Sequence, residues 1–261
     1  MKILLKIQYV GTRFCGFQCQ KNGRSVQETL TEASEKVFGE KCLVTGCSRT
    51  DAGVHALGFC CTVEPEKAGG KPNPVPVGKI HRAYAGVLPG DISVVAATEV
   101  ADDFHPRYCS KGKRYIYRIW DAPYYDPFEA GRSMKCLFPV TGEKLERAKK
   151  AAEYFKGTHD FSSFMASGSK ITDAVRTVTE SELYRDGEAL IFSVAADGFL
   201  YNMVRIMAGT IIDCAAGRTE PCDVPEIIEK CDRSAAGATA PAEGLYLKDV
   251  FYDFQPDWKC E

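Results

Sequence analysis

The stretch KCLVTGCSRTDAGVHALGFCCTVE (residues 41–64) joins two apolar runs through a short, charged loop. Its two ends, KCLVTGC and GFCCTVE, are rich in apolar and β-branched residues, as strands are. The loop places Arg49, Asp51 and His55 close together, and the glycines around them allow backbone angles that other residues avoid. The stretch therefore predicts two neighbouring strands whose connection presents a carboxylate.

The residues of this loop leave two interpretations of Asp51 open. Its carboxylate could act as a nucleophile or a general base, with the Arg49 guanidinium keeping it ionised. Alternatively, the Asp-Ala-Gly sequence is an ordinary turn in which Asp51 caps its own backbone. His55 could also serve as a base, but a single histidine between apolar neighbours is more often structural.

Elements on both sides of this stretch give residues 1–105 the order strand, helix, strand, strand, helix, strand. The first helix has a capping box, because Ser25 is followed three residues later by Glu28. Apolar residues then recur at helical spacing, whereas they alternate in the first strand. The elements outside the quoted stretch are ILLKIQYV (3–10), SVQETLTEASEKVF (25–38), KIHRAYAGVLPGD (79–91) and ISVVAATEV (92–100).

Residues 106–261 repeat this order with additional elements. An Asp-Gly pair marks the turn of a hairpin, and one helix is apolar on nearly every face, so we expect it to be buried. The chain is thus predicted to be α+β, with a domain 1–105 and a domain 106–261 related by internal pseudo-symmetry. The elements of the second domain are KRYIYRIW (113–120), TGEKLERAKKAAEYFKG (141–157), the hairpin AVRTVTESELYRDGEALIFSVAADGF (174–199), the buried helix YNMVRIMAGTIIDCAAG (201–217), DVPEIIEKCD (223–232) and the strand AEGLYLKDVFYDF (242–254).

Composition argues against several classes of protein. No apolar run approaches the roughly 20 residues that span a bilayer, and the alternating start of the chain lacks a signal-peptide cleavage site. We therefore expect a cytoplasmic protein without a membrane partner.

The twelve cysteines form no CxxC pair and the four histidines no HxxxH pair, which argues against a metal site. We expect reduced cysteines that pack as small apolar residues. P-loop, GxGxxG, GxSxG and HExxH motifs are absent.

Charge is distributed unevenly along the chain, although the net charge is only −2. Residues 106–185 contain 15 Lys and Arg against 10 Asp and Glu, a net of +5, and residues 186–261 contain 6 against 14, a net of −8. The middle of the chain could therefore face a polyanion, although lysines on solvated helix faces give the same count.

Two further segments contain candidate site residues. In KGKRYIYRIW, strand alternation puts Tyr115 and Tyr117 on one face, and basic residues beside aromatic rings suit nucleic acid. An ordinary strand with a buried aromatic face has the same pattern.

In FLYNMVRIMAGT, Arg205 lies in an otherwise apolar helix. A buried arginine needs a carboxylate, for which Asp51 is an attractive partner. Alternatively, Arg205 reaches solvent at the helix end. A fourth segment, GTHDFSSFMA (157–166), could bind a ligand or simply dock its phenylalanines on the core.

These segments, in this order, resemble the tRNA pseudouridine synthase family of the TruA type over essentially the whole chain. RTDAGVHA (49–56) is the most specific element of the resemblance. The chain departs from the usual pattern at Phe17, Ser48 and Asn202, where tryptophan, glycine and histidine are more usual. The supporting motifs are SVQETL (25–30), LPGDI (88–92), DDFHPR (102–107), KRYIYRI (113–119), HDFSSF (159–164), FLYNMVR (199–205) and AEGLYL (242–247).

The resemblance implies a cofactor-free isomerase that converts uridine to pseudouridine at positions 38, 39 and 40 of the tRNA anticodon stem-loop. It implies two RRM/ferredoxin-like halves with mainly antiparallel sheets, joined across a central catalytic cleft, and a homodimer that tRNA spans. Asp51 would be the catalytic aspartate, Tyr115 the aromatic residue packed on the target base, and Arg205 the partner of the aspartate. Arg49 would help to displace the uridine from its helix.

Two other classes of function remain as alternatives. A non-catalytic tandem RNA-binding protein would use the same aromatic strands without needing Asp51 or a buried Arg205. An RNA glycosidase or nuclease usually needs two carboxylates, and Asp160 is the second candidate for such a pair. Uridine isomerisation involves no net redox change or group transfer, so it requires no cofactor.

Overall fold

The computed structural model of the chain divides it into two compact units, each described by itself. The first unit comprises Met1–Lys111 and Leu247–Glu261, and the second comprises Gly112–Tyr246. The division falls close to the boundary expected at residue 105, but the end of the chain groups with the first unit rather than with the second. The structure describes residues 2–21, 23–66, 75–168 and 171–260.

Contacts made by the C-terminal segment explain why it belongs to the first unit. The backbones of Ala97 and Lys259 exchange hydrogen bonds of 3.2 and 2.9 Å. The Tyr252 hydroxyl donates to the carbonyl of Pro106 at 3.0 Å, and the Tyr252 ring packs edge-on against Phe104. The sequence predicted this segment as a strand of the second half, but strand pattern alone does not identify the sheet it joins.

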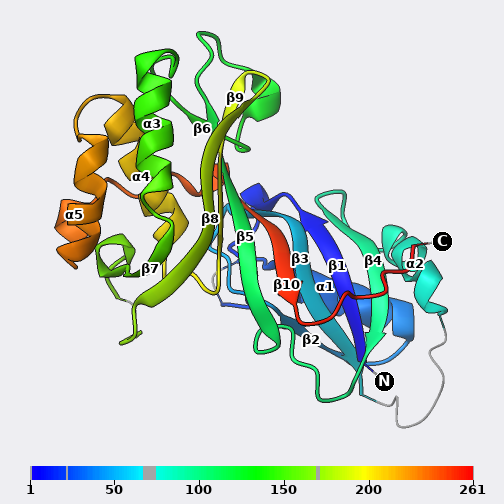
Figure 1. The fold of residues 1–261 in the computed structure, drawn as a ribbon. Coiled ribbons are helices and arrows are strands. Elements are labelled where there is room, and N and C mark those ends of the chain that lie inside the picture. The colour runs from blue at the N-terminus through cyan, green and yellow to red at the C-terminus, as the bar shows by residue number, and fades with distance from the viewer. Residues whose placement is uncertain (1, 22, 67–74, 169–170, 261) are drawn as a thin grey trace. The chain divides into compact units, whose positions relative to one another are not determined.

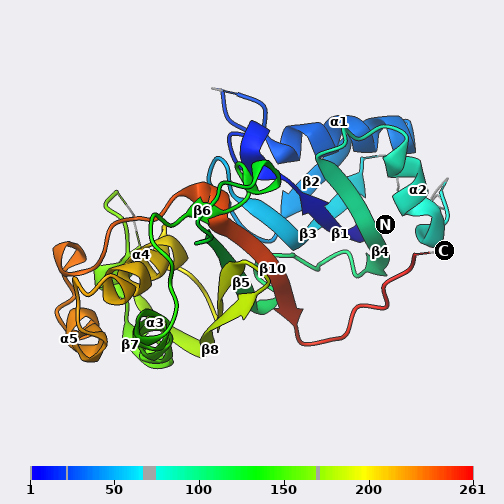
Figure 2. The ribbon, with the colours of Figure 1, turned by 90° about the horizontal axis from the view of Figure 1, so that it is seen from above.

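The first unit is an antiparallel sheet covered by two helices. Strand β1 pairs with both β3 and β4, and β2 pairs with β3. Helix α1 packs against β2, β3 and α2, and α2 packs against β4, so both helices cover the same face (Figures 1 and 2). The elements are β1 (Lys2–Tyr9), α1 (Val26–Phe38), β2 (Cys42–Gly46), β3 (His55–Pro65), α2 (Ile80–Ala85) and β4 (Ile92–Val100), with most of β10 (Leu245–Tyr252) beside β3.

Local sequence signals account for the boundaries of α1. The Ser25 side chain accepts from the backbone N–H of Glu28, and the Glu28 side chain accepts from the N–H of Ser25, which confirms the predicted capping box. The helix ends at Gly39, whose φ of 72° is left-handed. The buried face of the helix includes Val26 and Leu30, as the spacing predicts.

The second unit is also a mainly antiparallel sheet with helices, ordered β5-β9-β8-β7. The short β6 pairs with β5 in parallel, and α3 packs against α4 and β8 (Figure 1). The predicted hairpin between β8 and β9 is confirmed, but its two-residue turn is Gly187–Glu188, because Asp186 still pairs with Ala189. Gly187 has a left-handed φ of 57°. The elements are β5 (Ser110–Trp120), β6 (Met134–Lys135), α3 (Glu143–Glu153), β7 (Gly157–Asp160), β8 (Val175–Asp186), β9 (Ala189–Ala196), α4 (Met203–Ala215) and α5 (Val224–Glu229).

The two units share one arrangement of strands. In the first unit β1 and β2 both pair with β3, and α1 lies between β1 and β2 in the chain. In the second unit β5 and β8 both pair with β9, and α3 lies between β5 and β8. This repeat confirms the predicted α+β class, with similar halves and mainly antiparallel sheets.

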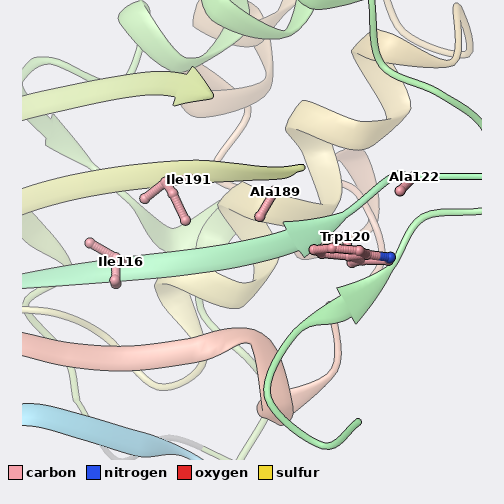
Figure 3. Packing of buried hydrophobic residues seen from close by; sticks show 5 residues of the cluster. All are labelled: Ile116, Trp120, Ala122, Ala189 and Ile191. Atoms are coloured by element: carbon pink, nitrogen blue, oxygen red, sulfur yellow. The ribbon is translucent and has the colours of Figure 1, made fainter. Parts of the chain in front are cut away.

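Apolar side chains cover one face of β5 and β9 in the second unit. Figure 3 shows four of them, Ile116, Trp120, Ala189 and Ile191, together with Ala122, which follows the end of β5. Because side chains alternate along a strand, the neighbouring tyrosines of β5 point to the opposite face. Both tyrosines are buried, so the sheet is covered on each side.

The segment after β5, residues 121–142, is mostly irregular and is held by arginine–carboxylate pairs. Arg185 contacts both carboxylate oxygens of Asp121 at 2.9 and 2.8 Å, and the Val140 N–H donates to the same carboxylate at 2.7 Å. Arg118 likewise forms two hydrogen bonds with Glu129, at 2.9 and 2.8 Å. Such bidentate pairs fix geometry as well as charge.

The cysteines behave largely as predicted. The twelve thiols are free, and six of them are buried. Burial raises the pKa of Cys42 and of Cys214 to about 12, so both stay protonated and weakly nucleophilic.

Among the described helices, none combines the length and apolar content needed to cross a membrane.

Candidate active site

The loop between β2 and β3 forms a turn at Asp51. The Val54 N–H donates to the Asp51 carbonyl at 3.2 Å, and Gly53 has a left-handed φ of 81°. Asp51 is half-buried, whereas Arg49 is exposed. The loop is therefore a turn in its backbone, and both interpretations of the Asp51 carboxylate stay predictions.

The segment GTRFCGF (11–17) packs directly against this turn. The Phe17 N–H donates to the Thr50 carbonyl at 3.2 Å, and the Gly53 N–H donates to the Phe14 carbonyl at 3.3 Å. A Cβ added at Gly16, which has a φ of 102°, would overlap the Thr50 carbonyl oxygen. The sequence prediction missed this support, because nothing in the segment indicates that it folds onto the Asp51 loop.

Aromatic packing and one buried hydroxyl pair complete the support of the loop. The ring of Phe17 stacks on Phe59 with centroids 4.2 Å apart, and it lies so close to Gly46 that a Cβ there would overlap it. The hydroxyl groups of Tyr9 and Thr50 lie 2.9 Å apart in a buried hydrogen bond. Thr50 thus contacts supporting groups through both its backbone and its side chain, next to Asp51.

His55 has a structural role in the first unit. It is fully buried, and its Nδ1 accepts the backbone N–H of Gly11 at 2.9 Å. A ring nitrogen that accepts an N–H carries no proton, so Nε2 bears the proton in the neutral ring. A Cβ added at Gly11 would overlap the Val54 carbonyl, so this glycine also allows the close approach. These contacts favour the structural interpretation of the histidine.

In the second unit, Tyr115 is buried on β5 and contacts the turn before α4. Its ring meets Phe199 edge-on, with centroids 4.9 Å apart and an interplanar angle of 80°. The same turn contains Asn202, the residue that precedes α4. The predicted aromatic residue and the start of the predicted arginine helix are therefore neighbours.

Arg205 is half-buried in the first turn of α4 and is held by two neutral oxygens. Its Nε donates to the Ala240 carbonyl at 2.7 Å, and its Nη1 donates to Asn202 Oδ1 at 2.7 Å. The Ala240 N–H donates in return to the Arg205 carbonyl at 3.1 Å. The arginine is neither a fully solvated helix end nor a fully buried charge.

The residues that provide the Ala240 carbonyl form a strap, GATAPAEG (237–244), that lies along α4. A Cβ added at Gly209 would overlap the Ala238 carbonyl, and the Gly237 N–H donates to Thr210 Oγ1 at 3.0 Å. The strap is also fastened to β5, because the Tyr117 hydroxyl donates to the Pro241 carbonyl at 2.7 Å. Burial raises the pKa of the Tyr117 hydroxyl, which therefore remains a neutral donor.

Asp160 caps a short turn. Its Oδ1 accepts the N–H of Ser162 at 2.9 Å and the hydroxyl of Ser162 at 2.6 Å, and these bonds lower the pKa of the carboxyl. The nearby rings of Phe161 and Phe164 are fully buried, so this segment is docked on the core. In the described part of the chain, no three His, Cys, Asp or Glu side chains gather as a metal site requires.

The structure thus brings Arg49 and Asp51 together in one loop of the first unit. It brings Tyr115 and Arg205 to one end of α4 in the second unit, where Phe199 and Asn202 join them. The sequence prediction named the first four of these residues from motifs. It did not identify the roles of Phe199 and Asn202, which depend on backbone geometry.

Comparison with known proteins gives one consistent result. A family model described as tRNA pseudouridine synthase matches residues 6–109 and 151–253. Three curated relatives carry the description tRNA pseudouridine synthase A. They are proteins of Acetivibrio thermocellus (42% identical, covering 96% of this chain and 99% of the relative), Ruminiclostridium cellulolyticum (40%, 96% and 99%) and Staphylococcus aureus (38%, 97% and 91%).

Proposed function

Because the chain belongs to the tRNA pseudouridine synthase family, we propose that it isomerises uridine to pseudouridine at positions 38, 39 and 40 of the tRNA anticodon stem-loop. The isomerase activity on tRNA follows from the family and from relatives that match almost end to end. The observation that carries the proposal is that the matched ranges include the loop with Arg49 and Asp51. They also include Arg205 on α4. Tyr115 lies between the two matched ranges, so its role depends more on geometry.

The reaction defines what the site must do. The bond between N1 of uracil and C1′ of ribose breaks, and a bond forms between C5 and the same C1′. The base gains a proton at N1 and loses the one at C5, so atoms and electrons balance without an oxidant or reductant. A carboxylate can assist by attacking the sugar as a nucleophile or by accepting a proton as a base. We assign that role to Asp51, on a loop fixed by close backbone packing.

Arg205 and Tyr115 have supporting roles in this proposal. A guanidinium beside a carboxylate favours its ionised form, so Arg205 would keep Asp51 charged at neutral pH. Neutral oxygens orient the guanidinium of Arg205 without cancelling its charge. Tyr115 would pack on the detached uracil while it turns, and its contact with Phe199 limits the positions that its ring can adopt.

Arg49 and the basic middle of the chain would act on the RNA. A paired uridine must leave its helix before it can react, which costs a few kcal/mol. Arg49 is exposed on the Asp51 loop and could compensate by binding the displaced strand. Residues 106–185, with a net charge of +5, would contact phosphates, so tRNA affinity should fall with rising salt. We also propose that the protein is a cytoplasmic homodimer, which sedimentation of the full chain would test.

The activity is tested by mapping pseudouridine in transcripts of one tRNA that differ only at positions 38, 39 and 40. We expect product at uridines in these positions and none when cytidine replaces them. A matched control is the transcript with all three cytidines, in which every other uridine should stay unmodified. Tight binding of tRNA without any isomerisation would instead favour the RNA-binding alternative, and product only outside the anticodon arm would refute the proposed substrate positions.

A further inference from the structure

Asn202 has an unusual backbone conformation at the start of α4. Its φ of 59° and ψ of 11° are left-handed, and Cys231, with a φ of 49°, is the other described non-glycine residue with positive φ. Left-handed angles cost most residues about 1–2 kcal/mol, and asparagine is among the few side chains that tolerate them. The strain suggests that this residue has a role that outweighs its local cost.

The side chain of Asn202 does not perform the usual task of its position. A residue preceding a helix normally accepts a backbone N–H from the first turn, but Asn202 forms no such cap. Its Oδ1 accepts instead from Nη1 of Arg205, three residues later, at 2.7 Å. The Asn202 amide therefore binds the Arg205 side chain rather than a backbone N–H of the helix.

Two acceptors of Arg205 lie on separate segments and fix different atoms of its side chain. The Ala240 carbonyl, on the strap, accepts from Nε, and the Asn202 amide, on the turn before α4, accepts from Nη1. Two hydrogen bonds to different nitrogens fix the plane of a rigid guanidinium more tightly than either bond does by itself. Both oxygens are neutral, so these two bonds orient the guanidinium without adding an opposite charge.

We propose that Asn202 is a positioning residue for uridine isomerisation: it holds the Arg205 guanidinium in the orientation that the reaction requires. This inference rests on the proposed function, and it adds a residue that acts only through Arg205. Removal of the amide leaves the arginine and its charge in place but takes away one of the bonds that set the direction of the guanidinium.

Asn202→Gly separates the contribution of the side chain from that of the left-handed backbone. Glycine adopts left-handed angles without strain, so this variant removes the amide oxygen and keeps the turn. Cys231→Gly is the matched control, because it also replaces a left-handed residue by glycine and its thiol contacts the Ile228 carbonyl in α5. Single-turnover rates on tRNA, KM for tRNA and melting temperature would be measured for both variants.

We expect Asn202→Gly to lower the single-turnover rate by about 10- to 100-fold, the range for one lost hydrogen bond to a charged group. Its KM and melting temperature should stay close to those of the wild type, and Cys231→Gly should match the wild type in all three measurements. If Asn202 acts only through Arg205, the same substitution in an Arg205→Lys background should change the rate by less than about threefold.

The outcomes separate this inference from the activity on which it rests. An Asn202→Gly variant as active as an active wild type overturns the inference alone. A loss of rate that is equally large in the Arg205→Lys background also overturns it, because Asn202 would then act by another route. A wild type that forms no pseudouridine overturns the proposed function, and this inference with it.

Discussion

The Asp51 loop and the surroundings of Arg205 are held in place by different kinds of contact. The loop in the first unit depends on glycines, which have no Cβ, so the backbone of residues 11–17 can lie directly against it. Arg205 in the second unit depends on acceptor atoms that are present, on Asn202 and Ala240. A substitution that adds a side chain should therefore strongly destabilise the first region. In the second region, loss of an acceptor or of its support should lower stability or the reaction rate by a smaller amount.

The largest effect is expected from Gly16→Ala. The added Cβ would overlap the Thr50 carbonyl oxygen and would also need a left-handed backbone, so we expect a loss of about 3–4 kcal/mol in the free energy of unfolding. Gly39→Ala is the matched control: Gly39 has a φ of 72° and no atom within 4 Å of an added Cβ, so only about 1 kcal/mol should be lost. Denaturant unfolding measures both, and equal losses would contradict the role of the close approach.

Asp121→Asn tests the second unit through the ion pair between the buried Asp121 and the more exposed Arg185. The amide cannot keep a charged, two-fold contact with Arg185, and we expect a loss of about 2–3 kcal/mol at pH 7. A loss below about 0.5 kcal/mol would show that segment 121–142 does not depend on this pair. Equilibrium unfolding of the two proteins in parallel provides the comparison.

The same pair predicts a dependence of stability on pH. Burial alone would raise the pKa of Asp121, but hydrogen bonds from Arg185 and the Val140 N–H outweigh burial and hold that pKa below its ordinary value. A carboxyl with a lowered folded-state pKa stabilises the fold above its unfolded pKa of about 3.9 and loses this contribution as pH falls through the folded pKa. The stability difference between wild type and Asp121→Asn should therefore be constant from pH 7 to about 5 and shrink below about pH 4.

A smaller effect is expected from Tyr117→Phe. This change removes the hydroxyl that donates to the Pro241 carbonyl and leaves that oxygen without its donor, at a cost of about 1 kcal/mol. Because Pro241 follows the Ala240 acceptor of Arg205, the rate should also fall, by less than about tenfold. A variant with a wild-type melting temperature would show that the strap does not need this contact.

The smallest effect is expected from Tyr115→Phe. Phenylalanine keeps the ring that meets Phe199, so the rate of isomerisation should stay within about threefold of the wild type. Tyr115→Ala removes the ring and should lose most activity, and the two variants together separate packing from the hydroxyl. An unaffected Ala variant would refute the packing role.

The sequence predicted those features whose causes are local. The capping box of Ser25 and Glu28, the β8–β9 hairpin and the buried α4 all follow from neighbouring residues. The repeated order of strands and helices then indicated the α+β class with two similar halves.

The missed features depend on contacts between distant segments or on backbone angles. Gly11 and Gly16 support a loop some 40 residues later in the chain, and no spacing in the sequence indicates that approach. Asn202 is only three residues from Arg205, but its left-handed φ is not readable from its identity. The C-terminal strand was predicted as a strand, whereas its membership in the first unit depends on its contacts with Ala97 and Pro106. The pairing of Asp51 with Arg205 stays a prediction.

The most direct test of the central claim is the single-turnover rate of Asp51→Asn on tRNA, with the dissociation constant measured on the same protein. Asparagine has nearly the same size as aspartate but is neither a nucleophile nor a base, so the fold and the binding surface should be kept. We predict a rate lower by about 10³-fold or more, with tRNA affinity within about threefold of the wild type. A rate within tenfold of the wild type would contradict the assignment of Asp51 as the catalytic residue.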